Sequence, residues 1–258
     1  MKNRLKEILR AGQVAIGGAI TSSNLDAAEI MARMGFDWLV FDTEHAPLSI
    51  GTVQALMQAA KGTEIVPIVR VAWNDMVLIK LALDIGAYGI IIPWVNNQAE
   101  AVRAVRACKY PPAGIRGVGP RRAAEYGTRT QEYMRTADEE VMVIPQIETE
   151  EAVNNAEEIL SVKGMDAFIV GPADLSTSLG VPLQFDHPKF VKAIKKVLQA
   201  GKKAKIPAGM FAPGAEAAAR FISQGFQLVC VGGDIGFLMN GCRAALEKVA
   251  PLRTKTIV

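Results

Sequence analysis

Histidine and cysteine are scarce in this sequence, and long apolar runs are missing. The 258 residues include two histidines and three cysteines, Cys108, Cys230 and Cys242. An odd number of widely spaced cysteines suits neither a disulfide framework nor a zinc site, so we expect buried free thiols in a reducing compartment. No apolar run approaches the roughly 18 residues of a membrane helix, and the charged N-terminal segment does not resemble a signal peptide. We therefore expect a soluble, cytoplasmic protein.

An excess of charge of one sign is also missing. The formal net charge is +3, which gives no electrostatic reason to expect nucleic acid or an anionic membrane as a partner. Half of the residues are hydrophobic and 21% are charged, as in an ordinary globular chain. A chain of this length fits one α/β-barrel domain.

Short apolar runs alternate with longer amphipathic ones along the whole chain. The short runs are rich in Val and Ile and apolar on both faces, as buried parallel strands are. They cover residues 15–21, 38–43, 65–71, 89–95, 141–147, 167–170, 208–212 and 228–232. Several helical patterns between them stop at a glycine, as helix C-termini do, namely at Gly35, Gly62, Gly86, Gly201 and Gly225.

Eight strand–helix units in sequence predict a closed (β/α)8 TIM barrel. We expect a single domain over residues 1–258, with an amphipathic helix at the N-terminus and a last helix at about 237–249. The alternative is a Rossmann-type sheet, but Gly17-Gly18 does not supply the required GxGxxG turn. Residues 111–140 have no assigned element, and loops of this length are usually functional or interfacial.

Polar residues follow four of the predicted strands. Active sites of such barrels are built at the C-terminal ends of the strands, where a charged group is costly to desolvate unless it is paired or binds something. The residues concerned are Asp42, Glu44 and His45 after the second strand, Arg70 at the end of the third, Gln146 and Glu148 at the fifth, and Gly171, Pro172, Ala173 and Asp174 after the sixth. We therefore predict one convergent polar site.

Two carboxylates at this end lie on adjacent predicted strands. Glu148 and Asp174 would repel each other, and one would take up a proton, unless a cation lay between them. A hard divalent cation such as Mg²⁺ or Mn²⁺ resolves the conflict. The alternative is that Glu148 caps the following helix and Asp174 caps a turn.

The remaining polar residues also have two interpretations each. His45 is flanked by Asp42 and Glu44, which suits an acid–base group, although a lone histidine is more often structural. Arg70 either forms a salt bridge at the barrel rim or points a cation at a carboxylate or an enolate oxygen. His187 precedes Pro188 and looks like a helix start.

Taken together, six segments resemble the HpcH/HpaI aldolase family, metal-dependent pyruvate aldolases within the phosphoenolpyruvate–pyruvate barrel superfamily. The resemblance spans nearly the whole barrel in order. The segments are GFDWLVFDTEHAPLS (35–49), PIVRV (67–71), GAYGIIIPWVNN (86–97), PPAGIRGVGP (111–120), IPQIETEEAVNNAEEI (144–159) and DAFIVGPADLSTSLG (166–180).

The resemblance implies a reaction and a role for each site residue. The reaction is the reversible cleavage of a 4-hydroxy-2-oxo acid to pyruvate and an aldehyde through a pyruvate enolate. The metal, Mg²⁺, Mn²⁺ or Co²⁺, would be held by Glu148 and Asp174. The other roles are carboxylate binding by Gln146 and the backbone at Gly171, Pro172 and Ala173, enolate stabilisation by Arg70, and acid–base transfer by His45 oriented by Asp42.

The resemblance also implies a hexamer. The last helix would pack on a neighbouring subunit, and the loop 114–126 would lie at an interface. Two segments depart from the family's pattern. Some close relatives carry a tryptophan where this chain has residues 18–21, and the loop PRRAAEYG is shorter than in the best-known aldolases of the group. Both segments border the acceptor side, so the aldehyde is left open.

Other functions stay possible at this point. An oxaloacetate decarboxylase would use the same metal and enolate. A Schiff-base aldolase needs a lysine inside the barrel mouth, and Lys80, Lys109, Lys163 and Lys205 are predicted elsewhere. A phosphate-ester enzyme would use Gly232-Gly233 as an anion nest. A non-catalytic oligomer is the last alternative.

Overall fold

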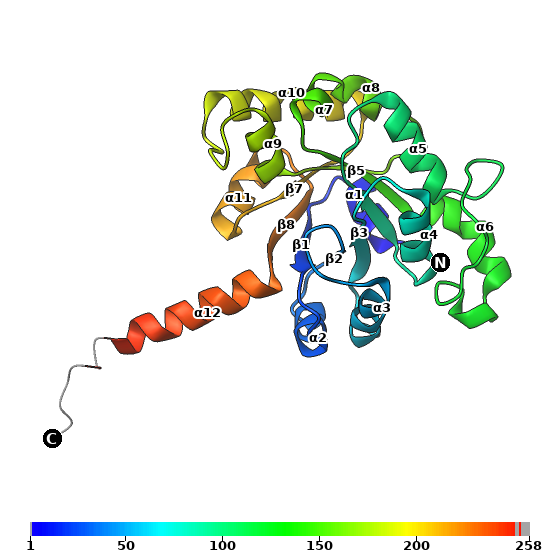
Figure 1. Cartoon of the computed structure of the whole chain (residues 1–258), viewed down its shortest axis with the longest axis horizontal. Coiled ribbons are helices and arrows are strands. Elements are labelled where there is room, and N and C mark those ends of the chain that lie inside the picture. Colours follow the sequence, from blue (N-terminus) through cyan, green and yellow to red (C-terminus); the bar gives the residue numbers. More distant parts are fainter. Residues whose placement is uncertain (1, 251–252, 254–258) are drawn as a thin grey trace.

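The chain forms a closed barrel of eight parallel strands in chain order (Figure 1). The computed structural model describes residues 2–250 and 253. The strands are β1 (Ala15–Ile20), β2 (Trp38–Asp42), β3 (Val66–Arg70), β4 (Gly89–Ile92), β5 (Met142–Ile147), β6 (Phe168–Val170), β7 (Ala208–Phe211) and β8 (Leu228–Gly233). The predicted (β/α)8 barrel is confirmed, and the pairing of β1 with β8 excludes the open Rossmann sheet.

Helices surround the barrel, and several begin at a side chain that caps the first turn. Asn24, Ser49, Asp75, Asn97 and Thr149 each accept a hydrogen bond from a backbone N–H of the helix that follows. The helices are α1 (Arg4–Arg10), α2 (Leu25–Arg33), α3 (Ile50–Ala59), α4 (Met76–Asp84), α5 (Gln98–Cys108), α6 (Thr130–Glu140), α7 (Glu150–Asn154), α8 (Ala156–Leu160), α9 (Pro172–Ser178), α10 (Pro188–Ala204), α11 (Ala215–Ser223) and α12 (Asp234–Val249), with a short 3₁₀ helix at Glu125–Gly127.

Two hydrophobic layers hold these elements. One fills the barrel and includes Trp38, Ile68 and Ile144, and the other lies between the strands and the helices. The predicted N-terminal helix is α1, whose Leu5 and Leu9 pack into the interior layer. The helix thereby closes the N-terminal end of the barrel and leaves the opposite end for the polar strand ends.

Two sequence predictions about the helices are wrong. Residues 111–140 are not one long loop, because they contain α6, which was missed since only Tyr133 and Ala137 of this polar helix are buried. Gly201 does not end a helix but lies inside α10. A Cβ at Gly201 would lie 2.6 Å from the Phe168 ring, so the glycine lets α10 approach β6. The predicted helix start at His187 is confirmed.

The last helix differs from the others in its surroundings. α12 projects away from the barrel in Figure 1, and residues 235–250 are all exposed. Near the start of α12, Phe237 stacks on Phe36 with ring centroids 6.2 Å apart. Within the described residues, no helix has the length and apolar character to cross a membrane.

Candidate active site

The site begins with an arginine held by an aspartate on the neighbouring strand. The register of β2 and β3 places Asp42 beside Arg70, so both side chains point to the same face. The guanidinium donates two hydrogen bonds to the Asp42 carboxylate, at 2.9 and 2.6 Å, and lies 4.9 Å from the centre of the Phe211 ring. Burial opposes the charge, but the hydrogen bond and charge of Asp42 raise the pKa of Arg70 above its ordinary value. Arg70 is therefore a fixed, permanently charged cation.

Glu44 extends this pair toward the centre of the barrel mouth. Its side chain is 8% exposed, and Oε2 lies 3.3 Å from the Arg70 guanidinium and 3.6 Å from Nε2 of His45. Burial is the main reason that its pKa rises to about 7, and Asp42 and Asp174 raise it further against the opposing charge of Arg70. Among the residues that the structure describes, Oε2 nevertheless has no hydrogen-bond partner. Sequence reasoning treated Glu44 only as a neighbour of His45 and missed its central position.

Glu148 lies completely buried just after β5. Its Oε1 accepts a 2.7 Å hydrogen bond from the backbone N–H of Trp94, and its Oε2 accepts one from the Gln146 side chain. Burial raises the pKa of Glu148 to about 7, with smaller contributions from the charges of Glu44 and Asp174. Thr149, not Glu148, caps α7. The capping alternative for Glu148 is therefore wrong.

Trp94 is a second residue that sequence reasoning missed. It follows β4 with a φ of 55°, a left-handed conformation that is uncommon for a bulky residue. This conformation accompanies the hydrogen bond of its N–H to Glu148 and a tilted ring contact with Trp73, with ring centroids 5.9 Å apart. A backbone N–H has no side-chain signature, so only the Pro93-Trp94 pair at a strand end could have suggested a turn here.

Asp174 occupies the first turn of α9, directly after β6. It is half-buried, and α9 has no side-chain cap, so Asp174 does not act as one. Its charge raises the pKa of both Glu44 and Glu148, because the three carboxyl groups share one region. A Cβ at Gly171 would lie 2.8 Å from Glu148 Oε2, so only glycine allows β6 to pass this close to the carboxylate. The structure thus brings the ends of β2, β3, β5 and β6 together.

His45 lies at the open side of this group. Its side chain is 56% exposed, and its ring faces the Glu44 carboxylate. Asp42 accepts from the backbone N–H groups of Glu44 and His45, at 3.0 and 3.4 Å. Asp42 therefore holds both the Arg70 guanidinium and the backbone turn that carries His45. Glu44, and not Asp42, is the carboxylate beside the imidazole.

The charge balance of the site fits a divalent cation. The charges of Asp42, Glu44 and Glu148 act on the cation Arg70, and Asp174 is a fourth carboxylic acid near Glu44 and Glu148. Buried oxygens of Glu44 and Gln146 have no hydrogen-bond partner within the described part of the chain, and such atoms are costly unless something binds them. In residues 2–250 and 253, no three His, Cys, Asp or Glu side chains form a ready-made metal cage. Two protein carboxylates with water and a chelating substrate would complete the shell of a hard cation.

Two alternative functions raised by the sequence, a Schiff-base aldolase and a phosphate-ester enzyme, lose support. The buried lysines, Lys6 and Lys109, bind backbone carbonyls of residues 138–141 that precede β5, at the opposite end of the barrel from the polar site. Next to Gly232-Gly233, Asp234 accepts hydrogen bonds from the backbone and hydroxyl groups of Thr21 and Ser22. This carboxylate takes up the nearby donors that a phosphate group would need.

Fold and site together define a (β/α)8 barrel with a cluster of buried acidic side chains at the C-terminal ends of its strands. The HpcH/HpaI aldolase/citrate lyase family matches residues 19–241, and the chain belongs to this family. The resemblance stated from the sequence is therefore confirmed.

Three relatives match over nearly their full length. A pyruvate aldolase of Rhizobium etli is 43% identical, with 96% of this chain and 98% of the relative covered. A 4-hydroxy-2-oxo-heptane-1,7-dioate aldolase of Salmonella typhimurium is 41% identical, with 95% and 93% covered. The crystal structure of an HpcH/HpaI aldolase/citrate lyase family protein from Burkholderia cenocepacia has a TM-score of 0.93 at 36% identity, with 96% of this chain and all of that chain covered.

Proposed function

We propose that the chain is a metal-dependent aldolase that reversibly cleaves a 4-hydroxy-2-oxo acid to pyruvate and an aldehyde. The observation that carries the proposal is the group of buried carboxylates next to a fixed arginine, in which the Glu44 carboxylate oxygen Oε2 and the Gln146 amide oxygen lack a hydrogen-bond partner among the described residues. The predicted aldolase class is confirmed by the two curated relatives, both aldolases at over 40% identity across nearly the whole chain.

The metal would be held by Glu148 and Asp174 and would be Mg²⁺, Mn²⁺ or Co²⁺. When bound, it would supply Lewis acidity that polarises the 2-oxo group and lowers the energy of the enolate. Glu148 suits this role because its position is fixed by the Trp94 N–H and the Gln146 side chain. Such fixed positioning of a ligand strengthens metal binding.

Arg70 would act on the negative charge that develops at the 2-oxo oxygen. A cation that is already oriented by Asp42 needs no reorganisation when the charge appears, and this is the most effective form of electrostatic stabilisation. Gln146 and the backbone at Gly171, Pro172 and Ala173 would position the substrate carboxylate. Gly171 precedes α9, and Pro172 and Ala173 open its first turn, where backbone N–H groups lack partners within the helix.

His45 would move the proton. In the cleavage direction it takes the proton of the 4-hydroxyl group, the C3–C4 bond breaks with release of the aldehyde, and the electron pair stays on the pyruvate enolate. Protonation at C3 then gives pyruvate. The exposed position of His45 beside Glu44 supports this role, because the group must reach the substrate and exchange protons with solvent.

A substrate comparison tests the proposal. Pyruvate with added metal and a panel of aldehydes should give 4-hydroxy-2-oxo acids, identified by mass, and borohydride with pyruvate should trap no lysine adduct. The decarboxylase alternative predicts a higher kcat/KM for oxaloacetate than for any hydroxy-oxo acid. That result, or a trapped lysine, would contradict the aldolase mechanism proposed here.

We also propose a homo-oligomer, as a hexamer, in which α12 packs on a neighbouring subunit. Leu238, Met239 and Leu246 on α12 are 65%, 55% and 53% exposed, which is costly for a helix left in water. The loop 114–126 is assigned to an interface as well, and its Val118 and Tyr126 are 67% and 64% exposed. The cytoplasmic location stays a prediction.

A further inference from the structure

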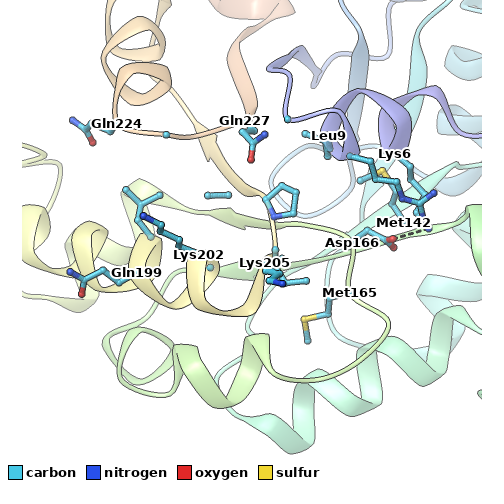
Figure 2. A pocket seen from close by; sticks show the side chains of 18 residues that line it. Lys6, Leu9, Met142, Met165, Asp166, Gln199, Lys202, Lys205, Gln224 and Gln227 are labelled. Carbon is cyan, nitrogen blue, oxygen red and sulfur yellow. Dashed lines mark ion pairs between the residues drawn. The ribbon is translucent and has the colours of Figure 1, made fainter.

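A cavity of about 930 Å³ lies at the N-terminal end of the barrel, opposite the proposed active site. Figure 2 shows it between α10 on one side and the segment from α11 to β8 on the other, with α1 nearby. Met142, the first residue of β5, lines it, whereas Gln146 lies near the other end of this strand and Glu148 lies just after it. A β-strand rises about 3.3 Å per residue, so the length of β5 separates the cavity at its start from the active site at its end.

The lining of this cavity is strongly cationic. It contains Lys6, Arg10, Lys202 and Lys205 but a single acid, Asp166. The buried Lys6 ammonium lies 2.7 Å from Asp166, so these two charges neutralise each other (Figure 2). The other three cations have no acidic partner in the part of the chain that the structure describes. A chain with a formal net charge of +3 thus concentrates three unpaired positive charges in one hollow.

The backbone at Lys205 gives a second, independent observation. Lys205 follows α10 in a left-handed conformation, with φ 59° and ψ 35°. At six other helix ends the left-handed residue is a glycine, namely Gly12, Gly35, Gly62, Gly86, Gly180 and Gly225. A side chain at such a position costs backbone energy that glycine avoids. The Lys205 side chain in this uncommon conformation lines the cavity.

We propose that this cavity binds a small polyanion, a molecule that carries phosphate or several carboxylate groups. Three unpaired cations match two or three negative charges. The side chains of Gln199, Gln224 and Gln227 lie around the same hollow in Figure 2 and add amide N–H donors. The volume lies within the range of about 300–1,000 Å³ of small-molecule sites. The site is independent of the aldolase reaction, because it shares no residue with the active site.

Methyl NMR of the full-length, Mg²⁺-saturated protein tests this site directly. Met142 and Met165 line the cavity, so ¹³C-methyl labelling of methionine places two reporters there. Inorganic phosphate and tricarballylate, titrated separately at constant ionic strength, serve as the phosphate and carboxylate probes. We expect saturable shifts of both methyl signals with at least one probe, and the tighter probe identifies the group that the site prefers.

Two double variants make the test specific. Lys202→Ala/Lys205→Ala should weaken binding at least about tenfold, a loss of about 1.4 kcal/mol. Lys163→Ala/Lys192→Ala removes the same charge from exposed positions outside the cavity and should change affinity by less than about twofold. The absence of saturable shifts at Met142 and Met165 with either probe would overturn the proposal. An equal loss in both double variants would also overturn it, because binding would then reflect overall charge.

Discussion

Replacing Arg70 tests whether the arginine is catalytic or only a salt bridge at the rim. Arg70→Ala removes the one cation beside the proposed enolate oxygen, and loss of a single oxyanion donor costs about 2.7–4 kcal/mol, or about 10²–10³ in kcat. The variant also leaves the Asp42 carboxylate, whose side chain is 4% exposed, without its partner. Breaking a buried pair destabilises a protein by about 3–5 kcal/mol, and proton uptake by Glu44, whose pKa is already raised, would offset part of this.

The assay separates these two effects. Pyruvate release from a hydroxy-oxo acid gives kcat at saturating metal, and thermal unfolding gives stability. Arg70→Lys keeps the charge without the two-pronged hydrogen bond and should fall between wild type and Arg70→Ala. Arg33→Ala is the matched control, because Arg33 forms an exposed pair with Glu29 and its loss should cost less than about 1 kcal/mol. A folded Arg70→Ala enzyme with kcat within a few-fold of wild type would refute the catalytic role.

Three further variants probe metal binding, ionisation and assembly. Gly171→Ala places a Cβ 2.8 Å from Glu148 Oε2 and should weaken metal binding at least about tenfold in calorimetry, whereas Gly51→Ala, with nothing nearer than 3.8 Å, should have no effect. The pKa of Glu148 rises from 4.5 to about 7 on folding, so the free energy of unfolding of the metal-free protein should fall as pH rises between these values. In urea unfolding, Glu148→Gln should reduce this dependence on pH. Leu238→Asp on α12 should reduce the particle mass in solution, and Leu183→Asp, at an equally exposed position, should not; equal masses for Leu238→Asp and wild type would count against packing by α12.

The barrel could be predicted from the sequence because its signals are local. Each strand is a short apolar run, and most helices show apolar residues at helical spacing. α6 was missed because it is a polar helix on the outside, and its two buried residues, Tyr133 and Ala137, give too weak a pattern. Gly201 was misread because a glycine that serves close packing looks the same in sequence as one that ends a helix.

The candidate site was only partly predictable, since its chemistry depends on contacts between strands. Strand-end positions pointed to the residues around Glu148, but the position of Glu44 follows from the pairing of β2 with β3 and from the nearness of the Gln146 and Asp174 side chains. The N–H of Trp94 on Glu148 has no signature in the sequence at all. The cavity around Lys205 combines helix ends and strand starts far apart in the chain, so it becomes visible only in three dimensions.

Titration of the metal-stripped protein with Mn²⁺ by calorimetry tests the central claim, that Glu148 and Asp174 hold one divalent ion. We predict one tight site per chain, with affinity that falls as pH drops below about 7, because the protonated form of Glu148 cannot ligate a cation. Glu148→Gln and Asp174→Asn should each weaken binding at least about 100-fold, or about 2.7 kcal/mol, and Asp186→Asn, at a fully solvated position, should leave it unchanged. Wild-type affinity and stoichiometry in either site variant would contradict the account.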